Sequence, residues 1–441
     1  MSDDDSPLDH VTPYDRFAWS DTQIEQWLAS GAHRRELVAY FGNREYRALA
    51  ALARRACAVP LADPGQRVLL VPGIMGSQLG LKRTAPLPHD IVWMDPIDIQ
   101  LGRLAMLRLT GAAPVVPLGV VLFSHLRLKL ALRAQGFAVE FHDYDWRLPV
   151  TECGRSFAER LRALRPASIA IVAHSMGGLV ARAALALPGT GHVERLVLLG
   201  TPNCGSFAAV QALRGTYAVV RKVARLAAQV SAETLAAEVF ATFPSLYDLL
   251  PAGACAPSID LFDPHAWPAS GPGPLPALLT AARAARGELA PADERFAAIA
   301  GVGEETVTGA VRRGEGFLYT LTRRGDGTVP LVSAELPGAR TLYAQVAHSD
   351  LTRDARVAAA VVDLLRRGKT ARLPARWPSA SLARAQVSDA QLRRTHPGKV
   401  NWGALTPEER RLFLENLNEP LKLSLRVPAR RHRRPRRPRR R

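Results

Sequence analysis

The segment with the clearest chemical meaning is Ala173-His174-Ser175-Met176-Gly177-Gly178. It follows an apolar run typical of a buried strand and precedes a helical pattern, so we expect Ser175 on a sharp strand-to-helix turn with small residues on both sides. The start of the following helix would place backbone N–H groups near developing negative charge. We therefore predict that Ser175 is a nucleophile; the alternative is that it only caps the helix.

A nucleophilic serine needs a base, and the base needs an acid that orients it. Downstream, Asp326 lies in the glycine-flanked loop Gly325-Asp326-Gly327-Thr328-Val329-Pro330, and His348 lies in a loop after the last apolar run. The order serine, acid, histidine is the order found in hydrolases built on a mostly parallel sheet. We predict Asp326 as the acid and His348 as the base.

Several other residues are weaker candidates for these two roles. His174 adjoins the nucleophile, but its side chain is expected to point away from it. Two histidines lie in irregular, proline-flanked segments, and two glutamates precede a segment that reads as a hairpin strand: His265, His396, Glu304 and Glu305.

The negative oxygen of an acyl-transfer intermediate needs two hydrogen-bond donors. One is expected from the N–H of Met176, the residue after the nucleophile. The other is expected from the N–H of Ile74, in the loop Pro72-Gly73-Ile74-Met75-Gly76-Ser77, whose glycines allow close backbone approach.

Short apolar runs and helical patterns alternate around these residues. The expected core strands are residues 68–71, 137–141, 168–173, 196–199, 296–302 and 341–346, and the expected helices between them include residues 123–134, 157–164 and 177–187. This alternation predicts an α/β-hydrolase fold, with a mostly parallel sheet covered by helices on both faces.

The chain divides into three predicted parts. Residues 1–62 form a helical extension, with breaks at Gly31 and at Gly42-Asn43. Residues 63–370 form the hydrolase domain, in which an insertion at about residues 205–294 makes a helical cap or lid; a packed structural excursion is the alternative. Residues 371–441 form an extension in which the strand pattern stops, a short helix spans residues 407–416, and a disordered tail rich in Arg and Pro ends the chain.

Charge and cysteine usage bear on location and partners. Of the net charge of +18, ten positive charges lie between Arg426 and Arg441, a stretch without acidic residues. This tail could contact the phosphates of an anionic membrane, or less favourably of nucleic acid, since no aromatic residue interleaves it for base stacking. No secretory signal is evident, and four scattered cysteines favour reduced thiols in a cytoplasmic protein, although a pairing of two stays open.

Several segments resemble the lecithin:cholesterol acyltransferase family of lipases and acyltransferases. The most selective are Val71-Pro72-Gly73-Ile74-Met75-Gly76-Ser77, Tyr144-Asp145-Trp146-Arg147-Leu148 and Phe243-Pro244-Ser245-Leu246-Tyr247-Asp248-Leu249-Leu250-Pro251. The resemblance spans roughly residues 66–368 and implies the same triad and the same oxyanion donors. The lid cysteine pair of that family has no convincing counterpart between Trp93 and Gly111.

We therefore predict a serine-dependent hydrolase or O-acyltransferase that acts on acyl esters of lipids, without cofactor or metal. Met75, Trp93 and Trp146 are candidate substrate-binding residues, although the apolar residues near the mouth could equally form the core of a lid. The alternative is a catalytically idle hydrolase scaffold that binds anionic membrane or nucleic acid through its basic tail.

Overall fold

The centre of the molecule is a six-stranded parallel sheet. The computed structural model describes residues 12, 14, 15, 20–60, 67–109, 114–164, 168–227, 229–377, 384–395 and 398–415. The strand order is β11 (Arg340–Ala344), β8 (Phe296–Gly301), β7 (Val193–Leu199), β6 (Ile169–His174), β1 (Arg67–Val71) and β5 (Ala138–Phe141). Next to the edge strand β5, Leu70 of β1 lies between Phe141 and Val172. Each strand lies within three residues of its predicted position, because buried parallel strands are almost entirely apolar.

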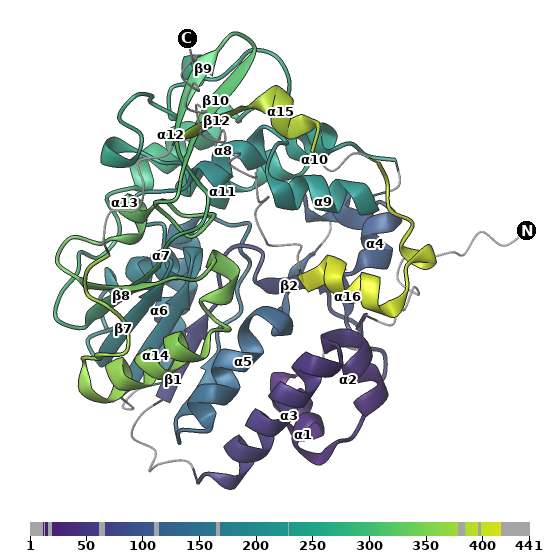
Figure 1. The fold of residues 1–441 in the computed structure, drawn as a ribbon, viewed down its shortest axis with the longest axis vertical. Helices are drawn as coiled ribbons and strands as arrows, with labels where there is room; N and C mark the ends of the chain where they lie inside the picture. The colour runs from purple at the N-terminus through teal and green to yellow at the C-terminus, as the bar shows by residue number, and fades with distance from the viewer. Residues whose placement is uncertain are drawn as a thin grey trace, which may run out of the picture.

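Helices cover both faces of this sheet (Figure 1). One face packs against α5 (Leu122–Arg133) and α14 (Ala355–Arg367), and the other packs against α7 (Met176–Leu185), with α6 (Val150–Ala163) beside it. This is the predicted α/β-hydrolase architecture. Apolar residues that alternate along β1 separate into the two cores, since Val68 and Leu70 face α5 while Leu69 and Val71 face α7.

A small antiparallel sheet follows β1 at its carboxyl end. It contains β2 (Ser77–Leu81), β3 (Asp90–Trp93) and β4 (Val116–Val120), and the connection carries α4 (Pro96–Gln100) and the 3₁₀ helix η2 (Arg103–Leu107). Arg147 donates hydrogen bonds to the carbonyl of Leu107, the last residue of η2, and to the carbonyl of Val115, directly before β4. The residues from Tyr144 to Arg147 therefore attach the connection between β3 and β4 to the main sheet.

The long insertion between β7 and β8 is helical, as predicted. It contains α8 (Phe207–Leu213), α9 (Ala218–Leu226), α10 (Ala232–Glu238), α11 (Pro244–Asp248) and α12 (Pro276–Ala285), with 3₁₀ helices η3 (Phe240–Thr242), η4 (Gly253–Cys255) and η5 (Pro264–Ala266). Helices α9 and α10 are separated before Ser231, whose side chain caps α10 by accepting from the N–H of Thr234.

A second antiparallel sheet lies beyond the insertion. The hairpin of β9 (Thr306–Arg313) and β10 (Gly316–Thr322) precedes the short α13 (Leu331–Ala334) and η6 (His348–Asp350), and β12 (Ala385–Ser388) pairs with β10. The prediction that strands stop after residue 371 is therefore wrong. The signal in β12 is weak because it has four residues, of which only Val387 is buried.

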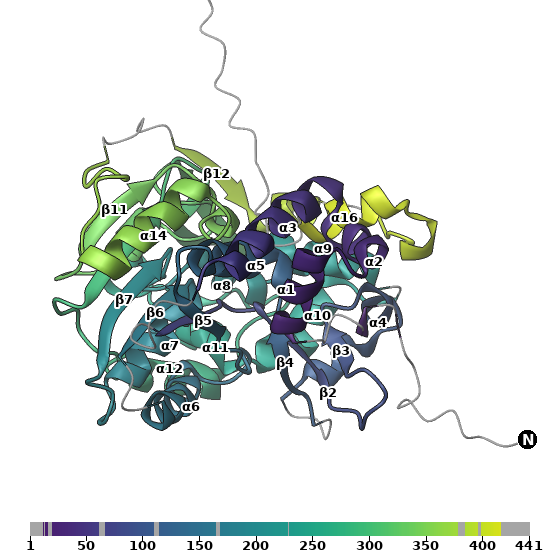
Figure 2. The same cartoon turned by 90° about the horizontal axis from the view of Figure 1, so that it is seen from below.

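Helices at both ends of the described chain pack beside the core. The breaks predicted at Gly31 and Gly42 separate α1 (Asp21–Ser30), α2 (Arg34–Phe41) and α3 (Asn43–Ala58), and both glycines have positive φ. Figure 2 shows α1 and α3 against α5.

The C-terminal part of the described chain contains α15 (Asp389–Arg393), η7 (Trp402–Ala404) and α16 (Pro407–Glu415). The short helix predicted at residues 407–416 is α16, and Thr406 and Glu409 form a capping box at its start. The Arg/Pro-rich tail lies outside the described residues. No helix in the described part of the chain is long and apolar enough to cross a membrane.

Candidate active site

Ser175 lies on a strained turn between β6 and α7. Its φ of 55° and ψ of −131° are rare for a residue with a side chain, and its N–H donates to the carbonyl of Leu199 over 2.9 Å. A Cβ atom at Gly177 would lie 2.3 Å from the carbonyl oxygen of Pro72. The small residue at this position is therefore required by the close approach of the loop after β1.

The three residues predicted to act together are brought together. The Nε2 atom of His348 lies 2.9 Å from the Oγ atom of Ser175, and its Nδ1 atom lies 2.8 Å from Oδ2 of Asp326. All three side chains are buried, and Asp326 has no exposed surface. Because a carboxylate can only accept, Nδ1 carries a hydrogen and Nε2 is left to accept from the serine hydroxyl.

The two oxygens of Asp326 have separate partners. Oδ1 accepts from the backbone N–H groups of Thr328 and Val329, at 3.0 and 2.7 Å, which leaves Oδ2 for the imidazole. The backbone N–H of His348 also donates to the carbonyl of Asp326 over 2.9 Å. The acid loop and the histidine loop are thus joined by both side chain and backbone.

His174, which was predicted to point away from the nucleophile, packs against His348. Its ring lies 4.7 Å from the ring of His348, and its Nε2 atom lies 3.0 Å from the backbone carbonyl oxygen of His348. Burial lowers the pKa of His174 well below its usual value, so the ring is neutral and Nε2–H donates. The only feature of the sequence that pointed to this contact with His348 was the position of His174 next to the nucleophile.

The loop after β1 lies directly against the nucleophile. A Cβ atom at Gly73 would lie 2.7 Å from Cβ and 3.2 Å from Oγ of Ser175. Within the described residues, neither the N–H of Ile74 nor that of Met176 donates a hydrogen bond to the protein. Two backbone donors are therefore available beside Ser175, at the positions predicted for the oxyanion donors.

Three buried aromatic residues hold this loop in place. The indole N–H of Trp93 donates to the carbonyl of Met75 and that of Trp146 donates to the carbonyl of Ser77, both over 3.0 Å, while the hydroxyl of Tyr144 donates to the carbonyl of Pro72 over 2.8 Å. Met75 itself has a left-handed φ of 62°. These contacts could not be predicted from the sequence, because they are made to backbone atoms far away in the chain.

An apolar cavity of about 100 Å³ opens above Ser175. Its walls come from the loop after β1, from α5, from the cap helices α8, α9 and α11, and from the loops that carry Asp326 and His348. The lining residues include Ile74, Met75, Ser124, Ala209 and Leu246. Of the three predicted substrate-binding residues, Met75 lines the cavity, whereas Trp93 and Trp146 are fully buried in the core and do not.

The weaker candidates are placed outside the triad. Glu304 pairs through its backbone with Asp326, and His265 is exposed on η5. His396 lies outside the described residues. Within the described part of the chain, no group of His, Cys, Asp and Glu side chains is arranged to hold a metal ion.

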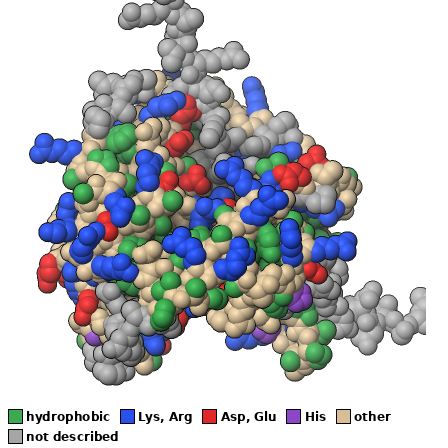
Figure 3. Space-filling view, turned by 60° about the horizontal axis from the view of Figure 1, so that its bottom comes forward, with side chains coloured by type: hydrophobic (Ala, Val, Ile, Leu, Met, Phe, Trp, Pro, Cys, Tyr) green, Lys and Arg blue, Asp and Glu red, His purple; other side chains and the backbone are tan. Residues whose placement is uncertain are grey.

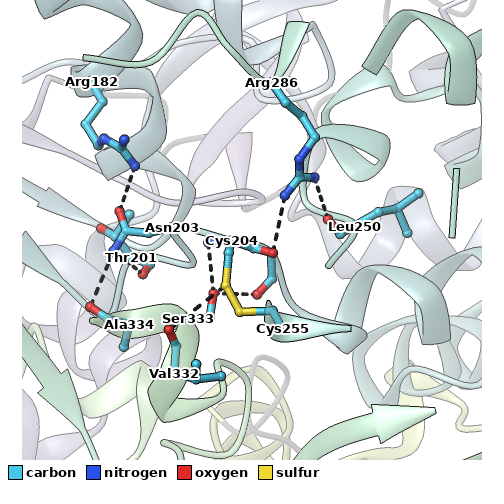
Figure 4. Close-up of a disulfide and its surroundings, with 11 residues drawn as sticks. Arg182, Thr201, Asn203, Cys204, Leu250, Cys255, Arg286, Val332, Ser333 and Ala334 are labelled. Carbon is cyan, nitrogen blue, oxygen red and sulfur yellow. Dashed lines mark hydrogen bonds between the residues drawn. A yellow bond between two sulfur atoms is a disulfide. The ribbon is translucent and has the colours of Figure 1, made fainter. Parts of the chain in front are cut away.

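The segment between β7 and the cap is fixed by a network that includes a disulfide (Figure 4). Cys204 is bonded to Cys255 of η4, which corrects the expectation of reduced thiols for these two residues. Arg286 donates to the carbonyls of Leu250 and Cys204, and Asn203 accepts from Arg182. The base of the cap is therefore tied to the strand ends that carry the site.

Comparisons with known proteins give the following matches. Residues 157–240, which include Ser175 and the start of the cap, match a family model described as PGAP1-like alpha/beta domain. No curated protein sequence matches the chain.

Among solved structures, the mature form of the Bacillus licheniformis lipase BlEst2 has 16% sequence identity and a TM-score of 0.37, over 70% of this chain and 94% of the lipase. The Tle4-Tli4 complex gives 16% identity and a TM-score of 0.40, over 69% of this chain and 99% of the matched chain. The phospholipase PlaB from Legionella pneumophila, in complex with thio-NAD, has 16% identity and a TM-score of 0.18, over 33% of this chain and 27% of that one.

The predicted α/β-hydrolase type therefore agrees with both the sheet and the family match. The narrower resemblance to lecithin:cholesterol acyltransferases has no counterpart in these matches.

Proposed function

We propose that this protein is a serine hydrolase that cleaves acyl esters with lipid-like chains. The observation that carries the proposal is the unbroken series of contacts from Asp326 through His348 to Ser175, at 2.8 and 2.9 Å, at the base of an apolar cavity. A purely structural serine would not need a base and an acid at these distances.

The proposed reaction has two steps. His348 accepts the hydroxyl proton of Ser175 through Nε2 as Oγ attacks the ester carbonyl carbon, and Asp326 stabilises the resulting imidazolium. The N–H groups of Ile74 and Met176 bind the oxyanion. The alcohol leaves with the proton from His348, and water or an acceptor alcohol then releases the acyl group from Ser175. Transfer to an alcohol instead of water would make the protein an O-acyltransferase, as the narrower family resemblance implies.

The cavity supports an apolar acyl group. Ala209, Leu246 and Ile74 contribute apolar surface, and burying each methylene of a chain against such surface stabilises binding by about 0.8 kcal/mol. We therefore expect kcat/KM to increase with the length of the acyl chain until the cavity is filled.

The test compares wild type with Ser175→Ala and Ser124→Ala. Ser124 lines the same cavity and serves as the matched serine control. We expect Ser175→Ala to lose labelling by a fluorophosphonate probe and to lower kcat on long-chain esters by about 10⁶-fold, whereas Ser124→Ala keeps the label. Labelling or turnover that persists in a folded Ser175→Ala variant would disprove the proposal.

A further inference from the structure

A groove between three helices is not used by the proposed reaction. It lies between α3, α5 and α14, which Figure 2 shows next to one another, and it has a volume of about 370 Å³. Binding sites for small molecules commonly measure about 300–1,000 Å³, so the groove is large enough for one. None of the residues that line it also lines the cavity above Ser175.

The lining of this groove is largely aliphatic and can be reached from solvent. All three helices contribute partly exposed apolar side chains, which are Ala48 and Leu52 of α3, Ala131 of α5, and Ala358, Ala359 and Val362 of α14. No aromatic ring is among the described residues that line it. Because most of these side chains are small, the space between the helices suits a slender aliphatic chain.

Arginine side chains also line the groove. Arg55 of α3 and Arg372 are exposed, whereas Arg127 of α5 and Arg353 are partly exposed. No acidic residue is found among the described lining residues. The groove therefore combines an aliphatic surface with positive charge that solvent can reach.

Carboxylates outside the lining balance part of this charge. The Nε atom of Arg127 lies 3.0 Å from a carboxylate oxygen of Glu45, and that of Arg372 lies 2.9 Å from one of Asp363. A guanidinium nitrogen of Arg353 lies 3.8 Å from a carboxylate oxygen of Asp350. The charge of Arg55 is left over, so the groove as a whole is positive.

A ligand that matches both features has an aliphatic chain and an anionic head. Guanidinium groups match phosphate especially well, because they donate paired hydrogen bonds to its oxygens. Exposed arginines on α3 and α14 extend the positive charge around the groove: Arg54, Arg356, Arg366 and Arg367. Such a surround favours a ligand that is presented by an anionic surface.

A helix of a protein partner fits the groove less well. Two turns of an α-helix, about 10 Å wide and 11 Å long, would occupy more than twice the volume of the groove. An acyl chain is much narrower and needs no hydrogen-bond partners from the aliphatic lining. The size of the groove therefore favours a lipid.

We propose that this groove binds one anionic phospholipid of a membrane surface, with an acyl chain along the aliphatic lining and the phosphate on Arg55 and the neighbouring arginines. The proposal does not depend on the esterase function. Ser124 of α5 lines the catalytic cavity, and Thr352, which lines the groove, donates to its carbonyl over 2.5 Å. The bound lipid would therefore lie within about 18 Å of the catalytic cavity, which is the length of the 12-residue α5.

The experiment measures binding of dihexanoyl phosphatidic acid, a soluble phospholipid, to the full chain by titration calorimetry. Ser175→Ala serves as the background, so that the probe is not hydrolysed. We expect saturable binding. Dihexanoyl phosphatidylcholine, whose head group has no net charge, should bind at least about 10-fold more weakly, because its choline group is repelled by the arginines.

Two pairs of variants locate the bound probe. Arg55→Gln should weaken binding about fivefold, whereas Arg54→Gln, which removes the same charge from an exposed neighbour outside the groove, should leave the affinity unchanged. Ala358→Trp fills the groove and should abolish binding. Ala51→Trp, at an exposed position of α3 outside the groove, is its control.

Equal losses in Arg54→Gln and Arg55→Gln, or binding that Ala358→Trp does not change, would overturn the inference. Tighter binding of dodecanoate than of the phosphatidic acid would also overturn it, since a free fatty acid would then be the occupant. Analytical ultracentrifugation tests a second copy of the chain as the occupant. We expect Ala358→Trp to have the same oligomeric state as wild type, and loss of a dimer in this variant would contradict the lipid assignment.

Discussion

At the scale of single residues, the candidate site depends on contacts to backbone carbonyls as much as on the triad. The indoles of Trp93 and Trp146 and the hydroxyl of Tyr144 fix three carbonyls of the loop at residues 72–77. This loop carries the N–H of Ile74, and Gly73 packs against Ser175. Loss of one indole donor should therefore displace the proposed oxyanion donor without removing it.

We predict that Trp93→Phe lowers kcat by roughly 10- to 100-fold with little change in KM, because a small displacement of an oxyanion donor affects only the transition state. The variant should also lose about 1–3 kcal/mol of stability, since the carbonyl of Met75 is left buried and unpaired. Steady-state kinetics and thermal unfolding measure the two effects.

The matched control is Trp267→Phe. Its indole also donates to a buried backbone carbonyl, that of Leu261, over 2.9 Å, but it packs against Phe317 away from the loop. The Trp267→Phe variant should therefore be less stable than wild type but have the same kcat. If both variants lost kcat equally, the effect of Trp93 would be general destabilisation.

The difference between Asp326 and His174 shows what can be predicted from sequence at this scale. Asp326 and His348 were predictable because their chain order and glycine-flanked loop are features of the sequence itself. The contact of His174 with His348 was not, because it depends on where the loop after β11 places the backbone carbonyl of His348. The carbonyl partners of Trp93 and Trp146 were hidden for the same reason.

At the scale of elements, the cap is attached to the sheet at its base. Cys204 follows β7 and is joined to Cys255, 51 residues later, across α8 to α11. The backbone N–H of Cys204 donates to the hydroxyl of Ser333, and that hydroxyl donates to the carbonyl of Gly205. The cap, the disulfide and the loop after Asp326 therefore meet at one point.

We predict that Cys255→Ser lowers the free energy of unfolding by about 2–4 kcal/mol, because the unfolded chain regains the freedom of the 51-residue loop. Thermal unfolding with and without reductant provides the measurement. Wild type should be destabilised by reductant, and the variant should not respond further. Cys57→Ser, which removes an exposed free thiol, is the control and should behave as wild type.

A wild type that was insensitive to reductant and as stable as Cys255→Ser would show that the bond contributes nothing. The paired cysteines also remove the argument from reduced thiols for a cytoplasmic location, since disulfides persist mainly in oxidising compartments.

The elements that the sequence predicted well share one property. The six core strands, helices α5 and α7 and the second half of α6 have apolar patterns set by burial on known faces of a sheet. The elements that it missed, β12 and the sheet of β2, β3 and β4, are four or five residues long and depend on pairing with distant strands. Ala173 and Gly177 were read correctly as small residues because close approach is a local steric requirement.

At the scale of the whole molecule, basic residues extend beyond the tail. Figure 3 shows Lys and Arg side chains over much of the face that is seen when the lower end of Figure 1 is turned forward. Helices α3 and α14 lie at that end, and their exposed basic residues are Arg44, Arg47, Arg54, Arg55, Arg356, Arg366 and Arg367. Without residues 426–441 the chain would still carry a net charge of +8.

We propose that the tail and this face attract anionic membranes, and we predict that deletion of residues 426–441 weakens sedimentation with phosphatidylserine-containing vesicles without abolishing it. Each basic residue near such a surface contributes about 1 kcal/mol to binding. At physiological ionic strength this attraction falls off over a distance of about 8 Å from the surface, and at lower salt it reaches further. The difference in the bound fraction between full-length and truncated protein should therefore shrink as salt is raised.

Neutral phosphatidylcholine vesicles are the control and should bind neither protein. Equal binding of the two proteins to anionic vesicles at low salt would exclude the tail from membrane attraction, and the exposed arginines of α3 and α14 would then be the residues to neutralise.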